Sequence, residues 1–234
     1  SKTASEDVTV TLGTSGAATE GTDYGSLSNI TVTAGSLTGT TTFTPTDDSI
    51  YDATSNETAT VSVDSVSGGD ALENGNQSVT ITITDNESAP TVTLSRSAAA
   101  IDENSSSTVT ITATLSNATY QDVTVSIGAS GGTEGTDYAT ISDITISAGS
   151  TTGTTSLDPT DDSVYEDDEA VTVTIDGVSG GSASESGSQS VTITISENES
   201  APTVTLSVSA TSIAENAGTS LTLTATLSGA TDET

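Results

Sequence analysis

The chain of 234 residues carries 33 Asp and Glu against 2 Lys and Arg, which gives a formal net charge of −31 at pH 7. Such a surface repels polyanions and attracts cations, so neither nucleic acid nor an anionic membrane is expected as a partner. The sequence contains no run of 18 apolar residues, and therefore no membrane-spanning helix is predicted.

The residue types that are missing restrict the chemistry further. The chain has no His, Cys, Met or Trp, and its aromatic residues are 5 Tyr and 1 Phe. A serine nucleophile would lack its usual His partner. A sugar-cleaving pair of carboxylates would lack aromatic platforms to hold a glycan. We therefore expect that the protein is not an enzyme, and the absence of Cys also excludes disulfides.

Long segments of the sequence occur twice in the same order. The paired segments begin at Thr19 and Thr133 (TEGTDY), at Pro45 and Pro159 (PTDDS), and at Gln77 and Gln189 (QSVTITI). Because the matches are colinear, they predict tandem copies of one structural module.

The register of these repeats divides the chain into three predicted parts. Residues 89–200 make one complete repeat, residues 1–88 make a repeat without its first strands, and residues 201–234 make those first strands. Two interpretations follow. Either the chain is a window on a longer covalent array, or residues 201–234 complete residues 1–88 of an identical neighbouring subunit by strand donation, head to tail.

Apolar residues alternate with Thr and Ser throughout the complete repeat, for example in Val109–Leu115, Val171–Ile175 and Val191–Ile195. This period of two is typical of strands with one solvated face, and helical spacing is absent. About seven such strands in a repeat of about 110 residues predict an all-β protein of tandem, seven-stranded immunoglobulin-like β-sandwiches. Tyr24 and Tyr138 are expected to pack at a sheet corner.

The acidic stretch PTDDSVYEDDE, from Pro159 to Glu169, has little positive charge to meet it, since Lys2 and Arg96 are the basic residues of the chain. A charge run of this kind is most often a solvated loop. Here, however, acids recur at the same junction in both repeats. Carboxylates about 4 to 6 Å apart repel by about 3 to 4 kcal/mol at an effective dielectric of roughly 20.

A bound cation, raised carboxylate pKa values or splayed, solvated loops would offset that repulsion. Among cations, calcium suits the residues best, because it takes about six to eight oxygen ligands from flexible loops. Softer metals prefer His or Cys, which the chain lacks.

The order of the motifs resembles the Calx-beta domain, a module also found in sodium–calcium exchangers and giant bacterial surface proteins. The resemblance rests on ENSSSTVTITATLS from Glu103, EGTDY from Glu134, the Pro159 stretch and SVTITISENES from Ser190. It implies a seven-stranded Ig-like sandwich that binds calcium at one tip.

Carried over residue by residue, the resemblance assigns the calcium ligands of the complete repeat to Glu103, Asp137, Asp161, Asp162, the carbonyl of Val164, Glu166, Glu169, Glu197, Asn198 and Glu199. The matching positions in the first repeat are Asp23, Asp47, Asp48, the carbonyl of Ile50, Asp52, Glu57, Asp85, Asn86 and Glu87. The equivalent of Glu103 for the first repeat is Glu215 of the tail, so strand donation would complete this site too.

These features predict a structural repeat of an extracellular filament, stalk or giant cell-surface protein, in which calcium at the domain tips fixes neighbouring repeats. Its partners would be neighbouring repeats or identical subunits. The alternative is an adhesin repeat whose loops bind a glycan or a protein at a cell surface. Aromatic-poor loops favour the structural interpretation, because binding hot spots are rich in Trp, Tyr and Arg.

Overall fold

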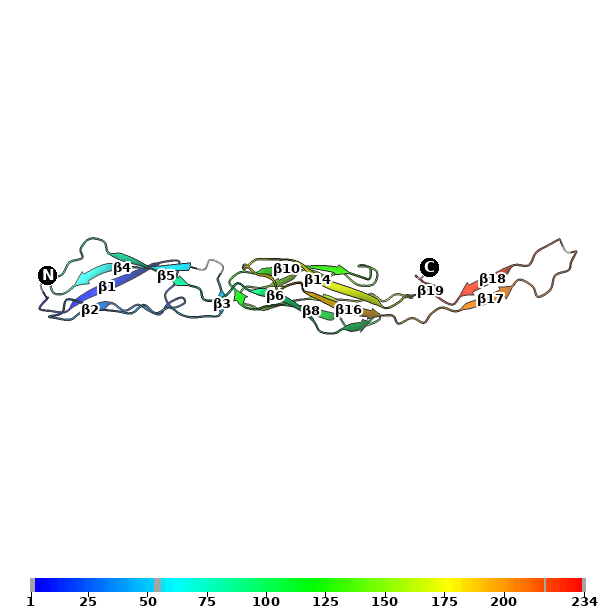
Figure 1. Ribbon diagram of the computed structural model, residues 1–234, viewed down its shortest axis with the longest axis horizontal. Helices are drawn as coiled ribbons and strands as arrows, with labels where there is room; N and C mark the ends of the chain where they lie inside the picture. Colours follow the sequence, from blue (N-terminus) through cyan, green and yellow to red (C-terminus); the bar gives the residue numbers. More distant parts are fainter. Residues whose placement is uncertain (1–2, 53–55, 217, 233–234) are drawn as a thin grey trace. The chain divides into compact units, whose positions relative to one another are not determined.

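The computed structural model describes residues 3–52, 56–216 and 218–232. All regular structure in these residues is β, which confirms the predicted class (Figure 1). By its internal contacts the chain divides into two compact units. The first unit takes the residues up to Ala89 together with Asn117–Tyr120, and the second takes Pro90–Ser116 and the residues from Gln121 onward. In the described part of the chain, no helix is long and apolar enough to cross a membrane.

The second unit contains a five-stranded sheet in the order β11-β10-β14-β16-β7. Its strands are β7 (Ala100–Asp102), β10 (Val123–Ser130), β11 (Ile144–Ile146), β14 (Glu169–Ser179) and β16 (Ser190–Ser196). The pairs are antiparallel except at one edge, where β7 runs parallel to β16.

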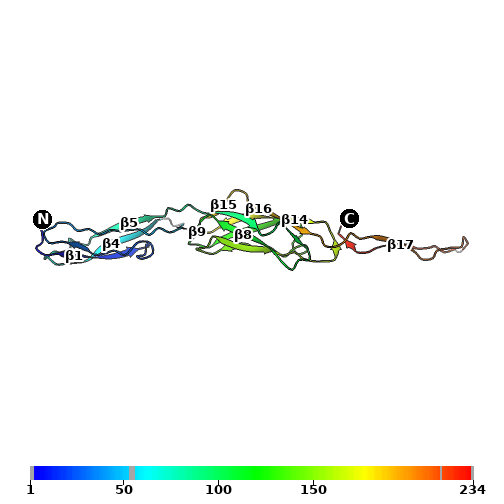
Figure 2. The ribbon, with the colours of Figure 1, turned by 90° about the horizontal axis from the view of Figure 1, so that it is seen from below.

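A four-stranded sheet in the order β12-β8-β6-β15 covers one face of the five-stranded sheet (Figure 2). Its strands are β6 (Thr91–Arg96), β8 (Val109–Leu115), β12 (Thr152–Leu157) and β15 (Ser184–Glu185). Every second residue of β8 is buried, as the alternating sequence predicts. Val109 and Ile111 of this sheet share one core with Val171 and Ile193 of the other.

This pair of packed sheets is the predicted immunoglobulin-like sandwich. The predicted count of seven strands per repeat is not confirmed, because the two sheets hold five and four strands. The difference includes β7 and β15, edge strands of three and two residues that lie outside the long alternating segments.

The first unit has a smaller core. The main sheet of its described residues has four strands, in the order β2-β1-β4-β5. The strands are β1 (Val8–Gly16), β2 (Ile30–Val32), β4 (Asn56–Ser67) and β5 (Ser78–Thr84). The core consists of Ala18, Tyr24 and Ala59, against which Phe43 and Ile83 pack. The Tyr24 ring stacks on Phe43 with the centroids 4.5 Å apart.

Tyr138 is buried in the second unit as Tyr24 is in the first, which confirms that both tyrosines are packing residues. Each Tyr also bridges to the Pro that begins the acidic loop, Tyr24 to Pro45 and Tyr138 to Pro159. The tyrosines therefore anchor the acidic loops to the sandwiches.

Short parallel ladders follow both acidic loops. In the first unit, β3 (Ile50–Tyr51) pairs with β9 (Ala118–Thr119). In the second unit, β13 (Val164–Tyr165) pairs with β19 (Ala230–Thr231). The remaining strands, β17 (Val204–Val208) and β18 (Leu223–Leu227), form an antiparallel sheet of their own (Figures 1 and 2).

Candidate metal centre

Strand register brings the acidic residues of the second unit to one end of the five-stranded sheet. β7 and β16 run parallel with Asp102 opposite Ser196, so Glu103 and Glu197 leave their strands side by side. A hydrogen bond of 3.0 Å from the Glu103 amide to the Ser196 carbonyl fixes this exit. Glu169, the first residue of the antiparallel β14, stands opposite Ile195 at the same end.

The centre of this region is a cluster of three carboxylates, Glu103, Glu197 and Glu199, which we call the Glu103 cluster. One oxygen from each lies within 4.8 Å of the others. Glu103 is 7% exposed, and its Oε1 accepts a hydrogen bond of 3.1 Å from the Asp162 amide. The acidic loop is thus tied to the cluster through its backbone.

Backbone amides orient Glu197 within the cluster. Its Oε1 accepts hydrogen bonds of 2.7 Å from the amides of Asn198 and Glu199, and its Oε2 accepts one of 2.5 Å from the Glu166 amide. Burial raises the pKa of Glu197, but these N–H donors outweigh burial and hold it below the usual value. Glu197 is therefore the member of the cluster that stays ionised most readily.

Other members of the region hold protons more strongly. A hydrogen bond with Glu197, together with burial, raises the pKa of Glu199 to about 7. Burial and the charges of Asp137 and Glu166 raise the pKa of Glu169 to about 7. Burial chiefly, and then neighbouring carboxylates, also raises the pKa values of Glu103 and Glu166. Without a cation, the region is partly protonated near neutral pH.

The remaining predicted carboxylate ligands lie close enough to Glu103, Glu166 and Glu169 for their charges to act on these residues. Asp162 caps its own loop, since its Oδ1 accepts a hydrogen bond of 2.7 Å from the Val164 amide. The Asn198 side chain donates a hydrogen bond of 3.5 Å from Nδ2 to Asp161 Oδ1. Asp137 accepts a hydrogen bond from the Thr133 amide. The structure thus brings the predicted residues of the complete repeat to one end of the sandwich, and their role as ligands stays a prediction.

The donor set fits a hard cation. Among the described residues, Glu199 Oε2 is buried and has no hydrogen-bond partner, which is costly for a carboxylate. One oxygen of Glu199 lies within 4.8 Å of oxygens of Glu103 and Glu197, so an added cation would be met by carboxylate ligands. Calcium prefers such ligands and tolerates irregular geometry, whereas magnesium demands a small octahedron.

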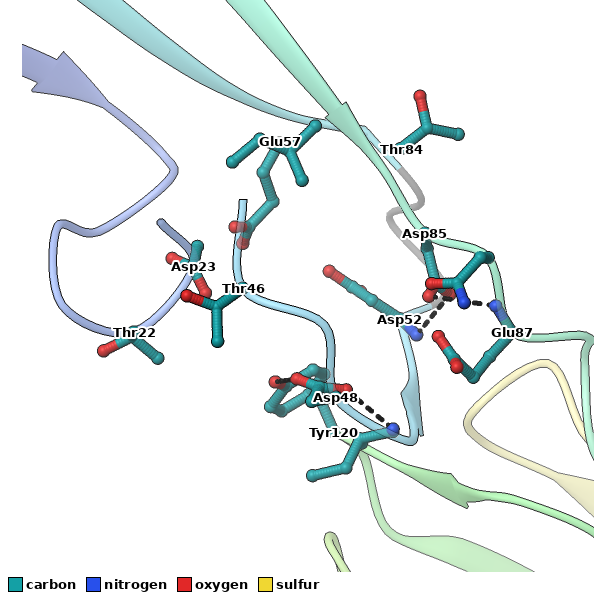
Figure 3. Close-up of a pocket in the computed structure, with 13 residues that line it drawn as sticks. Thr22, Asp23, Thr46, Asp48, Asp52, Glu57, Thr84, Asp85, Glu87 and Tyr120 are labelled. Carbon is teal, nitrogen blue, oxygen red and sulfur yellow. Dashed lines mark hydrogen bonds between the residues drawn. The ribbon is translucent and has the colours of Figure 1, made fainter. Parts of the chain in front are cut away.

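The first unit has an acidic cavity of about 330 Å³ at the equivalent place (Figure 3). The predicted residues that line it are Asp23, Asp48, Ile50, Asp52, Glu57, Asp85, Asn86 and Glu87. Figure 3 shows the carboxylates of Glu57 and Asp23 turned toward the same space. Asp47 does not line the cavity, although its charge contributes, after a hydrogen bond with Asp85, burial and the charge of Asp85, to the raised pKa of Glu87. Glu215 belongs to the second unit and is exposed.

Asp85 plays the part in the first unit that Glu197 plays in the second. Its Oδ2 accepts a hydrogen bond of 3.0 Å from the Asp52 amide, and its Oδ1 accepts one of 3.3 Å from the Glu87 amide. Burial opposes ionisation of Asp85, but these donors outweigh it and lower the pKa. Burial, and then the charges of Asp23 and Asp52, raise the pKa of Glu57.

Three residues of these regions were missed by the sequence analysis. Tyr120 lines the first cavity and donates a hydrogen bond of 2.8 Å to Asp48 Oδ2, which raises the pKa of Tyr120 to about 12. Asp168 accepts a hydrogen bond of 3.0 Å from the Glu197 amide. Asp232, the repeat equivalent of Tyr120, lines a pocket with Glu166 and Glu169. Tyr120 and Asp232 hold the same position in successive repeats, and this equivalence is the sequence signal that could have identified them.

Comparison with solved structures finds loose likenesses to a calcium-binding domain and to a bacterial integrin-binding protein. The CBD12 crystal structure from CALX1.2 is 15% identical, with 82% of this chain and 88% of that chain covered and a TM-score of 0.37. Invasin, a bacterial integrin-binding protein, is 19% identical, with 94% of this chain and 38% of that chain covered and a TM-score of 0.36. No curated protein matches the chain.

Models of domain families match two adjoining stretches of the sequence. Residues 88–199 match the LapA domain, and residues 1–87 match the Calx-beta domain. For residues 89–200 the Calx-beta assignment stays a prediction based on the shared motifs. The predicted resemblance to Calx-beta repeats is confirmed in the first repeat, whose residues 1–87 match the Calx-beta domain model.

Proposed function

We propose that the chain is a structural repeat region of an extracellular or cell-surface protein, in which calcium binds the acidic ends of the sandwiches and stiffens a filament or stalk. The observation that carries this proposal is the Glu103 cluster with its buried, unpartnered Glu199 oxygen. The Calx-beta and LapA matches suggest a surface or adhesion-related module. Under this proposal the carboxylates hold an ion and carry out no reaction.

The stiffening follows from what each acidic loop is joined to. β13 begins two residues after Asp162 and pairs with β19, and β3 begins two residues after Asp48 and pairs with β9. A cation that draws the carboxylates together would therefore also fix the segment that carries the ladder. The row of sandwiches is either one covalent array or separate chains that complete each other's sandwiches by donated strands.

Calorimetric titration of calcium into the whole chain tests the proposal. We expect dissociation constants of about 10⁻⁴ to 10⁻³ M, the range of extracellular calcium modules. Glu103→Gln should weaken binding at least tenfold, because it removes a buried ligand charge. Glu6→Gln, which removes an exposed charge outside both acidic regions, should leave binding unchanged. No binding heat at millimolar calcium, together with an unchanged melting curve in chelator, would contradict the proposal.

A second candidate function is an adhesin repeat that binds a glycan or a protein ligand. The LapA match over residues 88–199 favours it. Specific binding of the chain on a glycan array, lost when the acidic loops are replaced by Gly and Ser, would support this function. Absence of binding on glycan arrays and on cell surfaces would leave the structural function alone.

A further inference from the structure

The β17–β18 hairpin exposes the apolar side chains that its sequence equivalents bury. Val204 is 66% exposed, Leu206 is 71% exposed and Leu223 is 66% exposed. The same repeat positions in β6 and β8 are Val92, which is 0% exposed, Leu94, which is partly buried, and Ile111, which is 0% exposed. The hairpin therefore has the apolar pattern of a sheet that faces a core, but its apolar side chains are exposed.

The first unit has the complementary deficiency. A groove of about 300 Å³ runs over its sheet, lined by apolar residues that include Leu12, Ile30, Phe43, Val61 and Ile81. In the second unit the equivalents of Ile30, Val61 and Ile81, which are Ile144, Val173 and Ile193, are fully buried. There the covering layer is the sheet that contains β6 and β8.

Two segments beside this groove lack the pairing that their equivalents have. Residues 38–43 correspond to β12, which pairs along β8, yet they form no strand. Leu72 and Glu73 correspond to β15, which pairs with β6, and they also form no strand. Leu72 is 91% exposed. Both edges that would hold a β6–β8 pair are thus present and open.

We propose that the groove of the first unit binds the β17–β18 hairpin of a second copy of this chain. β18 takes the place of β8 against residues 38–43, and β17 takes the place of β6 beside Leu72 and Glu73. The occupant is identified by sequence, because the hairpin repeats the apolar positions of the strands that fill the equivalent groove in the second unit. Since each copy carries one groove and one hairpin, the contact is head to tail and produces chains of subunits.

The docked hairpin also completes the acidic region of the first unit. In the second unit Glu103 lies just beyond β7 and contacts the loop that carries Asp162. Glu215 holds the same repeat position, so docking places it near Asp85 and Glu87 of the receiving copy. This part of the inference rests on the proposed calcium function, whereas the apolar docking does not.

Sedimentation of the intact chain over concentrations from about 1 to 200 µM tests the docking. We expect a mass that rises with concentration through dimers to longer chains. Leu206→Asp should abolish this rise, because it puts a charge into the apolar groove. Thr205→Asp is the matched control: it adds the same charge to the next residue, whose equivalent Thr93 is exposed in the second unit, and association should persist. A monomer at every concentration would overturn the proposal.

A cross-link between copies tests the register. The pair Thr154 and Thr112 of the second unit stand opposite each other, which predicts that Thr40 of one copy stands opposite Thr224 of another. The chain has no Cys, so mixing Thr40→Cys chains with Thr224→Cys chains should give a disulfide-linked dimer of the two variants after mild oxidation. No mixed dimer, or a link formed within one chain that carries both substitutions, would overturn docking between copies.

The calcium proposal can fail separately from this one. Apolar docking should survive chelation, although more weakly, whereas the calcium affinity of the Glu103 cluster should be the same in the Leu206→Asp monomer. Loss of calcium binding with intact association would contradict the proposed function and leave the docking in place.

Discussion

The two repeats share their loops and most of their strands, yet one has a closed core and the other an open one. In the second unit, residues of β6 and β8 join those of β14 and β16 in a single buried cluster. In the first unit the equivalents of β14 and β16 are present as β4 and β5, but its buried cluster consists of Ala18, Tyr24 and Ala59. The first strands of a repeat therefore contribute few residues to the acidic loops and most of the residues that close the sandwich.

The largest expected effect separates the two cores directly. Ile193→Ala should destabilise the second unit by about 2 to 5 kcal/mol, because Ile193 is fully buried and its truncation leaves a cavity. The equivalent Ile81→Ala removes a side chain from an open groove and should cost about 1 kcal/mol or less in the monomer. Urea unfolding of both variants in the Leu206→Asp background measures the difference. Equal losses would mean that the groove is closed in solution.

Calcium removal should give the next largest effect. At calcium concentrations about 10 to 100 times the dissociation constant, bound ion adds about 1.4 to 2.7 kcal/mol per site. We expect the second unit to lose more stability in chelator than the first, because the first cavity has no counterpart of Glu103 among its own lining residues. Calorimetric unfolding with and without chelator measures both transitions. The reverse order would show that the Glu103 cluster is not the tighter site.

Much of this arrangement could be predicted from sequence, for physical reasons that differ between residues. Alternation in segments such as Val109–Leu115 determines which face is buried, and β8 follows it residue by residue. The recurrence of PTDDS at Pro45 and Pro159 indicated which loop carries the acidic region of each repeat. Short edge strands such as β7 and β15 were not predicted, because pairing distant in the chain creates them and their own residues show no period. Tyr120 was missed because Asp48, the residue that it contacts, lies 72 residues away in the sequence.

The effect of pH on the stability of the metal-free protein should be smaller than the effect of calcium removal. It should come mainly from the second unit. The pKa of Glu169 is raised to about 7, so below the unfolded value of about 4.3 its contribution to stability is fully present. That contribution is lost as the pH rises through about 7. Glu199 behaves in the same direction. We therefore expect the melting temperature in chelator to fall between pH 5 and pH 8, and calcium affinity to rise over the same interval.

General repulsion among the acidic residues would give the same sign, so a variant is needed to separate the two causes. Glu169→Gln removes one titrating group and should flatten the slope, whereas Glu6→Gln should leave it unchanged. If both variants keep the full slope, the protonation of Glu169 is not its cause.

The smallest expected effect concerns Tyr120, whose hydrogen bond to Asp48 distinguishes the first acidic region from the second, where Asp232 holds the equivalent position. Tyr120→Phe should cost about 0.5 to 1.5 kcal/mol of first-unit stability in chelator, the usual net value of one hydrogen bond, and the half-exposed ring favours the lower end. It also releases Asp48, so calcium affinity of the first unit should rise slightly, while Tyr120→Asp should raise it further by adding the carboxylate found in the second unit. Calorimetric titration of the two variants measures this order. A fall in affinity for both would mean that the Tyr120 hydroxyl holds Asp48 in the position that binds the ion.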